Sequence, residues 1–186
     1  MYRRSDFNQW RFGANFIPST AINQLEMWQP ETFDPATIER ELGWGAALGM
    51  RVMRVYLHDL LWVQNAPGFL ERIEQYLAIA DRFDIRTVFV FFDDCWSNEF
   101  ALGPQPPPRP GVHNSGWVQS PGRGAADNPA EWARLQDYVQ GVMRRFSHDR
   151  RILAWDLYNE PGNGAAGTHD HPAECRGSRS KALLNA

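Results

Sequence analysis

Short runs of hydrophobic residues alternate with longer segments in which hydrophobic residues recur at helical spacing. The runs Phe12–Ile17, Arg51–Leu57, Thr87–Phe92 and Ile152–Tyr158 predict four strands. The third run is apolar almost throughout, which is typical of a strand buried on both faces of a parallel sheet. Because helical segments separate the strands, the pattern predicts an α/β fold built on a parallel sheet.

Three helical segments lie between these runs, and two of them begin with a capping signal. Asp34-Pro35 and Asn128-Pro129 each join an N-cap side chain to a proline in the first turn, and Glu131 adds an acidic third position. The hydrophobic positions at helical spacing are Ile38, Leu42 and Ala46 in the first segment, Phe69, Ile73, Tyr76, Leu77, Ala80 and Phe83 in the second, and Trp132, Leu135, Val139, Val142, Met143 and Phe146 in the third.

Two further segments differ in character from the rest. Residues 93–127 follow the third strand and are rich in proline and glycine, so we interpret them as a substrate-facing loop rather than a linker. Residues 164–186 contain no Phe, Trp, Tyr, Ile, Val or Met, and we expect a disordered tail there. The sequence therefore predicts one domain over residues 1–163, followed by that tail.

Composition narrows the choice of partners. The chain has 186 residues, 43% of them hydrophobic, which is enough for one domain with a core. A net charge of −3 gives no electrostatic reason to expect nucleic acid or an anionic membrane as a partner. We find no apolar stretch long enough for a membrane span and no signal peptide, so the expected location is the cytoplasm by default.

Cysteine and histidine usage does not indicate a bound metal. Cys95 and Cys175 are too few for a disulfide framework. His169 and His171 lie close to Cys175, but this spacing matches no structural zinc site. We therefore expect no bound metal.

The most informative motif is Trp155-Asp156-Leu157-Tyr158-Asn159-Glu160-Pro161. It predicts a strand that stops at an Asn-Glu-Pro corner, because proline blocks continuation of the ladder. A carboxylate at the carboxyl end of a parallel strand occupies the position of catalytic groups in α/β barrels. At this motif the chain resembles the retaining glycoside hydrolases of the (β/α)8-barrel clan A, most nearly the cellulase-like family 5. The resemblance covers roughly residues 11 to 163.

The resemblance implies specific roles for three residues. Glu160 would be the general acid/base, Asn159 would hydrogen-bond the sugar 2-hydroxyl, and Arg54 would support the nucleophile carboxylate. The implied reaction is hydrolysis of a β-linked oligo- or polysaccharide with retention, and it implies no metal and no organic cofactor. In that family the nucleophile is a glutamate at the end of strand 7, and this chain offers no such strand. We therefore expect the N-terminal half of a barrel, a partial TIM barrel with its first four parallel strands and three helices.

Further residues at the carboxyl ends of the strands are candidates for substrate binding. The family often has a histidine after strand 3, where this chain has an aspartate pair. Tryptophans in loops after strands are expected to stack on sugar rings. The candidates are Asn15, Phe16, Trp28, His58, Asp93, Asp94, Trp96 and Trp117.

Other interpretations remain beside this one. The four strands could form an open sheet, or a homodimer that completes a pseudo-barrel, and open sheet edges would favour self-association. A carbohydrate-binding remnant without catalysis would explain the aromatic loops and the absent nucleophile equally well. A nucleotide-binding domain is disfavoured, because the first strand is not followed by a glycine-rich turn.

Overall fold

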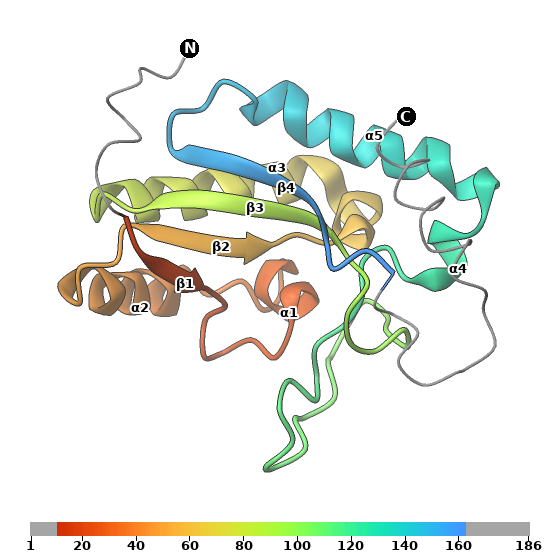
Figure 1. Cartoon of the computed structure of the whole chain (residues 1–186), viewed down its shortest axis with the longest axis horizontal. Coiled ribbons are helices and arrows are strands. Elements are labelled where there is room, and N and C mark those ends of the chain that lie inside the picture. The colour runs from red at the N-terminus through yellow and green to blue at the C-terminus, as the bar shows by residue number, and fades with distance from the viewer. Residues whose placement is uncertain (1–10, 163–186) are drawn as a thin grey trace.

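The computed structural model describes residues 11–162, which form a parallel sheet flanked by helices (Figure 1). The strands lie in the order β1-β2-β3-β4. Their bounds are β1 Gly13–Asn15, β2 Val52–Tyr56, β3 Arg86–Asp93 and β4 Ile152–Asn159. All four predicted strands are thus confirmed, and so is the α/β class with parallel pairing throughout. The proposed tail at 164–186, with His169, His171 and Cys175, lies outside the described residues.

The described residues contain five helices rather than the three that we predicted. Their bounds are α1 Gln24–Trp28, α2 Pro35–Ala47, α3 Asp59–Arg82, α4 Arg123–Ala126 and α5 Pro129–Phe146. The two extra helices, α1 and α4, span only one turn or little more, too short for a hydrophobic period to reveal them. Both predicted caps are present, since Asp34 accepts from the Thr37 amide at 3.0 Å and Asn128 from the Ala130 amide at 3.1 Å.

Helix α3 begins ten residues earlier than the hydrophobic pattern indicated. Pro67 lies inside it, and Asn65 breaks the helical backbone with φ −167°, so the element is two helical pieces joined at a kink. The first piece begins at Asp59, directly after the N-cap residue His58. The kink interrupted the repeat on which the prediction depended.

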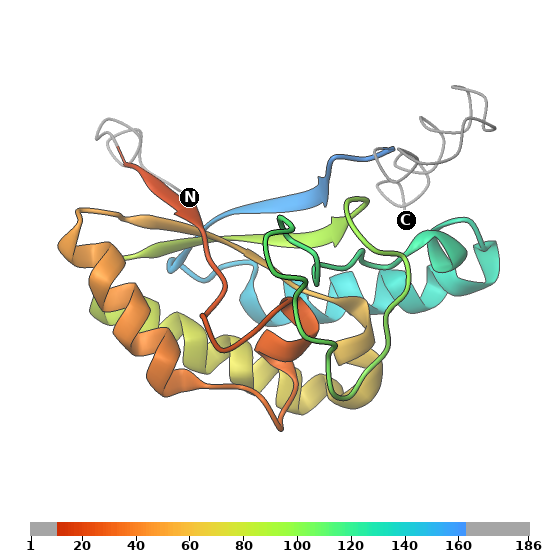
Figure 2. The same cartoon turned by 90° about the horizontal axis from the view of Figure 1, so that it is seen from below.

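The long helices α2, α3 and α5 all lie on one face of the sheet (Figure 2). Burial along β2 follows this arrangement, because Met53 and Val55 are buried whereas Arg54 and Tyr56 are only partly so. Side chains alternate between faces along a strand, so the polar residues of β2 share the face opposite the helices. This one-sided layering is the arrangement expected of a barrel segment, in which the helices form an outer ring around the strands.

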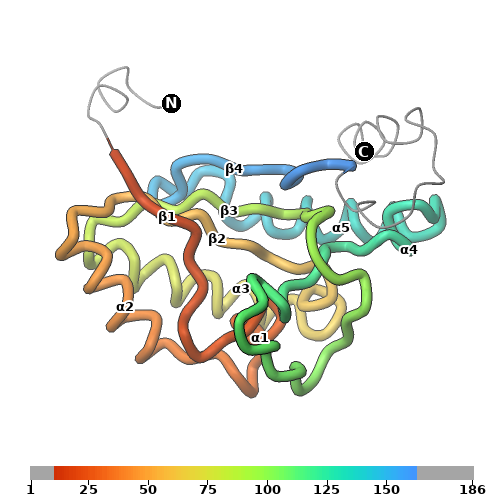
Figure 3. Tube along the Cα trace, turned by 60° about the horizontal axis from the view of Figure 1, so that its bottom comes forward, coloured from red at the N-terminus to blue at the C-terminus, as the bar shows by residue number. Residues whose placement is uncertain are grey.

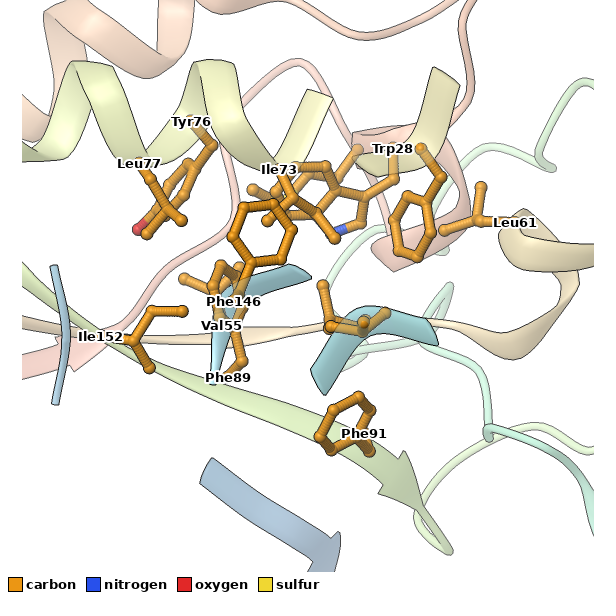
Figure 4. Packing of buried hydrophobic residues seen from close by; sticks show 14 of the residues in the cluster. Trp28, Val55, Leu61, Ile73, Tyr76, Leu77, Phe89, Phe91, Phe146 and Ile152 are labelled. Carbon is orange, nitrogen blue, oxygen red and sulfur yellow. The ribbon is translucent and has the colours of Figure 1, made fainter. Parts of the chain in front are cut away.

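The core fills the layer between the sheet and the helices (Figure 4). Phe89 and Phe91 of β3 meet Tyr76 of α3 and Tyr138 of α5 through ring contacts 5.5–6.0 Å between centroids. Trp155 stacks on Phe91 at 5.2 Å and so ties β4 to the same cluster. Burying each such side chain stabilises the fold by about 1.5–3 kcal/mol, which holds the strand ends in register.

The long loop between β3 and α5 folds back against α1 (Figure 3). Side chains in and beside α1 donate hydrogen bonds to the backbone of this loop: Asn23 to Gly116 O at 3.0 Å, Gln24 to Val118 O at 2.7 Å and Gln29 to Gly103 O at 3.0 Å. The loop is therefore anchored at several points and lies at the carboxyl end of the sheet. Among residues 11–162, no helix is long and apolar enough to cross a membrane.

Candidate functional site

Arg54 is the centre of a polar network on the sheet face opposite the helices. Its Nη2 lies 2.5 Å from Asp156 Oδ2 and 2.9 Å from Asn159 Oδ1, and its Nη1 donates to the Tyr56 hydroxyl. Burial disfavours the guanidinium charge, but the hydrogen bonds and charge of Asp156 outweigh it, so the pKa of Arg54 is raised. Arg54 is thus a fixed cation that connects β2 to β4.

The partner of Arg54 was not among the predicted site residues. Asp156 pairs with Val90, which lies two residues along β3 from Val88, the partner of Arg54. Because side chains on one face of a strand recur every two residues, both charged side chains lie on the same face. The sequence did contain a signal for such a partner, because an unpaired charge in an apolar strand is costly. An arginine within one strand requires an acidic side chain on the same face of another strand.

Asn159 is held from two sides. Its Oδ1 accepts from Arg54, and its Nδ2 donates to Asp93 Oδ1 at 2.9 Å. Asp93 is almost fully buried and also accepts from the Cys95 amide at 2.9 Å. Burial raises the pKa of Asp93, although these hydrogen bonds oppose the rise. The prediction that Asp93 contacts sugar is corrected, because its buried carboxyl orients Asn159 instead.

Glu160 lies at the corner that ends β4. It is exposed, and its backbone has φ +45°, in the left-handed region that residues with a side chain rarely adopt. Asp94 contacts the residues on both sides of it: the Asp94 amide donates to Asn159 O at 3.2 Å, and Gly162 N donates to Asp94 Oδ2 at 2.6 Å. The predicted acid/base residue therefore follows directly after the Arg54–Asn159 network.

A small hollow lies beside this network, at the carboxyl ends of β1 and β2. Its lining residues are Phe16, Ile17, Gln24, Met27, Tyr56 and Trp117. Tyr56 joins the hollow to Arg54, since its hydroxyl accepts from the guanidinium while its ring meets Trp117 edge-on at 6.0 Å. Burial raises the pKa of Tyr56 to about 12, so it stays a neutral phenol. Phe16 and Trp117, two of the candidates for substrate binding, thus line the same hollow.

Two more predicted residues lie at the rim. Trp96 is 41% exposed and contacts the Trp117 ring edge-on at 5.8 Å, so the tryptophans form one aromatic cluster over the loop. Asn15 is exposed at the end of β1 and accepts a long hydrogen bond from Arg54 Nη1 at 3.5 Å. Both side chains have surface available to a ligand.

The predictions for Trp28 and His58 are wrong. Trp28 ends helix α1 rather than lying in a loop, is 0% exposed and packs among Phe33, Phe69 and Tyr76 (Figure 4). Its indole donates to Tyr56 O at 2.9 Å. His58 is also fully buried, against Phe100. Neither side chain is exposed, so neither can contact a sugar, and both contribute to the buried packing that supports the site.

A second buried network fixes the start of α3. Asp59 is 0% exposed and receives Arg134 Nη1 at 2.7 Å and the Ser120 hydroxyl at 3.0 Å, with His58 Nδ1 at 3.1 Å. Burial opposes ionisation, but the contacts with His58 and Arg134 prevail and lower the pKa of Asp59 to about 2. This network joins α3, α5 and the long loop behind the site.

Within residues 11–162, no group of three or more His, Cys, Asp or Glu side chains is placed to hold a metal ion. The carboxylates near the site are engaged with protein groups instead: Asp156 with Arg54, Asp93 with Asn159, and Asp94 with Gly162.

In its fold, this chain is similar to part of solved glycoside hydrolase structures. No family model and no curated protein matches the sequence. Among solved structures, a GH5_18 protein from Streptomyces cattleya in complex with GlcNAc is similar with a TM-score of 0.60 at 17% identity. The similarity covers 94% of this chain and 40% of that one.

Two further structures support the same fold. One is a variant of the Streptomyces cattleya GH5_18 protein in complex with Manβ1-4GlcNAc, with a TM-score of 0.60, 16% identity, and coverage of 94% of this chain and 41% of that one. The other is a GH5_18 variant from Bifidobacterium longum in complex with the same disaccharide, with a TM-score of 0.59, 16% identity, and coverage of 95% and 39%. The predicted partial barrel is confirmed, and this chain spans about 40% of the length of these structures.

Proposed function

We propose that this chain carries the acid/base half of a glycoside hydrolase site that cleaves a β-linked glycan with retention. Glu160 would protonate the leaving glycosidic oxygen and then activate water. Asn159, held between Arg54 and Asp93, would hydrogen-bond the substrate next to the reacting carbon. The observation that carries the proposal is this fixed Asn159 directly before an exposed Glu160 at the carboxyl end of β4.

Retaining hydrolysis also needs a second carboxylate, about 5–5.5 Å from the acid/base. Asp93, Asp94 and Asp156 already bind protein groups, so none of these three is available as a nucleophile. The proposal therefore assigns the nucleophile to a carboxylate outside residues 11–162. A protein that contains this chain would need that group for turnover.

The aromatic residues at the rim support a glycan as the substrate. Trp96, Trp117 and Tyr56 form connected edge-on contacts around the hollow, and aromatic faces suit the apolar C–H surfaces of pyranose rings. Manβ1-4GlcNAc is the first disaccharide to test, because two of the similar structures hold it. We infer no cofactor requirement, since acid/base and nucleophilic carboxylates are sufficient for this chemistry.

The decisive experiment compares Glu160→Gln with the matched variant Glu99→Gln, which changes an exposed glutamate of the loop after β3. Each substitution would be made in a protein that contains this chain and supplies the second carboxylate, and hydrolysis of Manβ1-4GlcNAc and of aryl β-glycosides would be measured. The proposal expects Glu160→Gln to lower kcat/KM on the disaccharide by about 100-fold or more, with Glu99→Gln unchanged. Full activity of Glu160→Gln would overturn it.

A second candidate is a carbohydrate-binding protein without catalysis. It is favoured by one observation, the engagement of Asp93, Asp94 and Asp156 with protein groups. Calorimetric titration with Manβ1-4GlcNAc separates the two functions. Binding that Trp96→Ala weakens, together with no turnover of any glycoside, supports the binding protein.

A further inference from the structure

Asp94 binds the end of β4 through three separate contacts. Its amide donates to Asn159 O at 3.2 Å, its Oδ1 accepts from the Tyr158 hydroxyl at 2.8 Å, and its Oδ2 accepts from Gly162 N at 2.6 Å. These partners are two residues before Glu160, one before it and two after it. Asp94 itself follows directly after β3, so the contacts cross between neighbouring strands.

The corner at Glu160 needs such support. A left-handed backbone costs a residue with a side chain about 1–2 kcal/mol, and Glu160 has φ +45°. Gly162 also has a positive φ, of +92°. Charge-assisted hydrogen bonds to a carboxylate are about twice as strong as neutral ones, so the bond from Gly162 to Asp94 opposes relaxation of the corner toward an ordinary extended backbone.

Asp93 and Asp94 are adjacent but make different contacts. Asp93 performs a different task, because it is buried and orients the Asn159 side chain. Asp94 is only partly buried, and both of its carboxylate oxygens are directed to the β4 corner. Asp93 thus orients the Asn159 side chain, whereas Asp94 binds the backbone on both sides of Glu160.

We propose that Asp94 is a positioning residue for Glu160, fixing the corner so that the Glu160 carboxyl meets the glycosidic oxygen. This inference rests on the proposed function. In this role Asp94, which we predicted as a sugar contact, acts through the backbone of residues 159–162 rather than by touching the substrate. Misplacing a catalytic group by about 1 Å can cost on the order of 100-fold in rate.

The test uses the dependence of rate on the leaving group. A dinitrophenolate departs without protonation, whereas a phenolate or a sugar alkoxide needs the acid. Values of kcat/KM, which report the glycosylation step, would be measured on phenyl and dinitrophenyl glycosides of the same sugar. The proteins are wild type, Asp94→Ala, Asp94→Asn, Glu160→Gln and the matched control Glu99→Ala. Each is made in a protein that contains this chain and supplies the nucleophile, and each is checked for folding by circular dichroism.

The inference expects Asp94→Ala to lower kcat/KM on the phenyl glycoside by about 10- to 100-fold, but by less than about threefold on the dinitrophenyl glycoside. Asp94→Asn should stay within about threefold of wild type on both, because its Oδ1 can accept from Gly162 and its amide can donate to Tyr158. Glu99→Ala should match wild type.

Each other outcome has a distinct meaning. If Glu160→Gln shows the selective loss but Asp94→Ala slows both substrates equally, Asp94 is merely structural and the inference is overturned while the proposed function stands. If Asp94→Asn is as impaired as Asp94→Ala on the phenyl glycoside, the acceptor role is wrong. If wild type turns over neither glycoside, or Glu160→Gln retains full activity on both, the proposed function fails and the inference fails with it.

Discussion

Arg54 and Asp156 lie 102 residues apart in the sequence, yet their side chains pair across the face of the sheet that the helices leave open, with Nη2 2.5 Å from Oδ2. The Nε atom of Arg54 reaches the same carboxylate oxygen at 3.1 Å. Through Nη2 the guanidinium also holds Asn159, the residue before the proposed acid/base. One charge pair therefore couples the position of β2 to the site at the end of β4.

Arg54→Lys tests this coupling. A lysine ammonium cannot reproduce the guanidinium fork, so the contacts to Asp156, Asn159 and Tyr56 cannot all survive. We expect the free energy of unfolding to fall by about 1–3 kcal/mol, measured by urea denaturation at neutral pH. The matched control is Arg82→Lys, because Arg82 pairs with Glu39 at the surface, where the change should be below about 0.5 kcal/mol. Equal losses in the free energy of unfolding would show that the Arg54 network stabilises the fold no more than a surface ion pair does.

Trp28 and Trp96 should respond in opposite ways to truncation. Trp28→Ala removes a fully buried side chain from the core and should destabilise the fold by about 3–5 kcal/mol. Trp96→Ala should change stability by less than about 0.5 kcal/mol, but weaken binding of Manβ1-4GlcNAc by about tenfold. Thermal denaturation and calorimetric titration measure the two effects.

Trp44 supplies the control for this pair, because it is 60% exposed on α2, away from the strand ends. Trp44→Ala should leave both stability and sugar affinity close to wild type. A loss of affinity in Trp44→Ala as large as in Trp96→Ala would remove the reason to place sugar at the Trp96–Trp117 cluster.

The buried Asp59 network predicts a specific dependence of stability on pH. Because folding lowers the pKa of Asp59 from its ordinary value of 3.8 to about 2, its contribution is complete above pH 3.8 and is lost as pH falls through 2. Arg134→Met removes the arginine partner of Asp59 and should cost about 2–4 kcal/mol at pH 7. The difference from wild type should shrink as the pH is lowered from 4 toward 2, since Asp59 then becomes protonated in both proteins.

Urea denaturation between pH 7 and pH 2.5 would follow that difference. Arg144→Met is the matched control, because Arg144 lies on the exposed side of α5 with its guanidinium 3.5 Å from Asp137. Its effect should be small and vary little over the same range. A deficit in Arg134→Met that stays constant down to pH 2.5 would mean that Asp59 is not the group responsible.

Local features of the sequence were sufficient for much of this structure. The apolar runs predicted all four strands, and Asp34 and Asn128 marked two helix starts, because strand burial and capping depend on residues that are near neighbours in the chain. The Asn159-Glu160-Pro161 corner was visible for the same reason. Helix α3 was predicted too short only because Asn65 and Pro67 interrupt its repeat.

Contacts between distant segments were decided by the tertiary structure alone. Asp156 becomes the partner of Arg54 through strand register, Asp94 reaches Gly162 across two strand ends, and Trp28 is buried because α3 packs over it. Residue type shows that a charge needs a partner or that an aromatic ring needs cover. Which residue pairs with the charge, or packs over the ring, depends on how the whole sheet and its helices pack. No local sequence pattern contains that information.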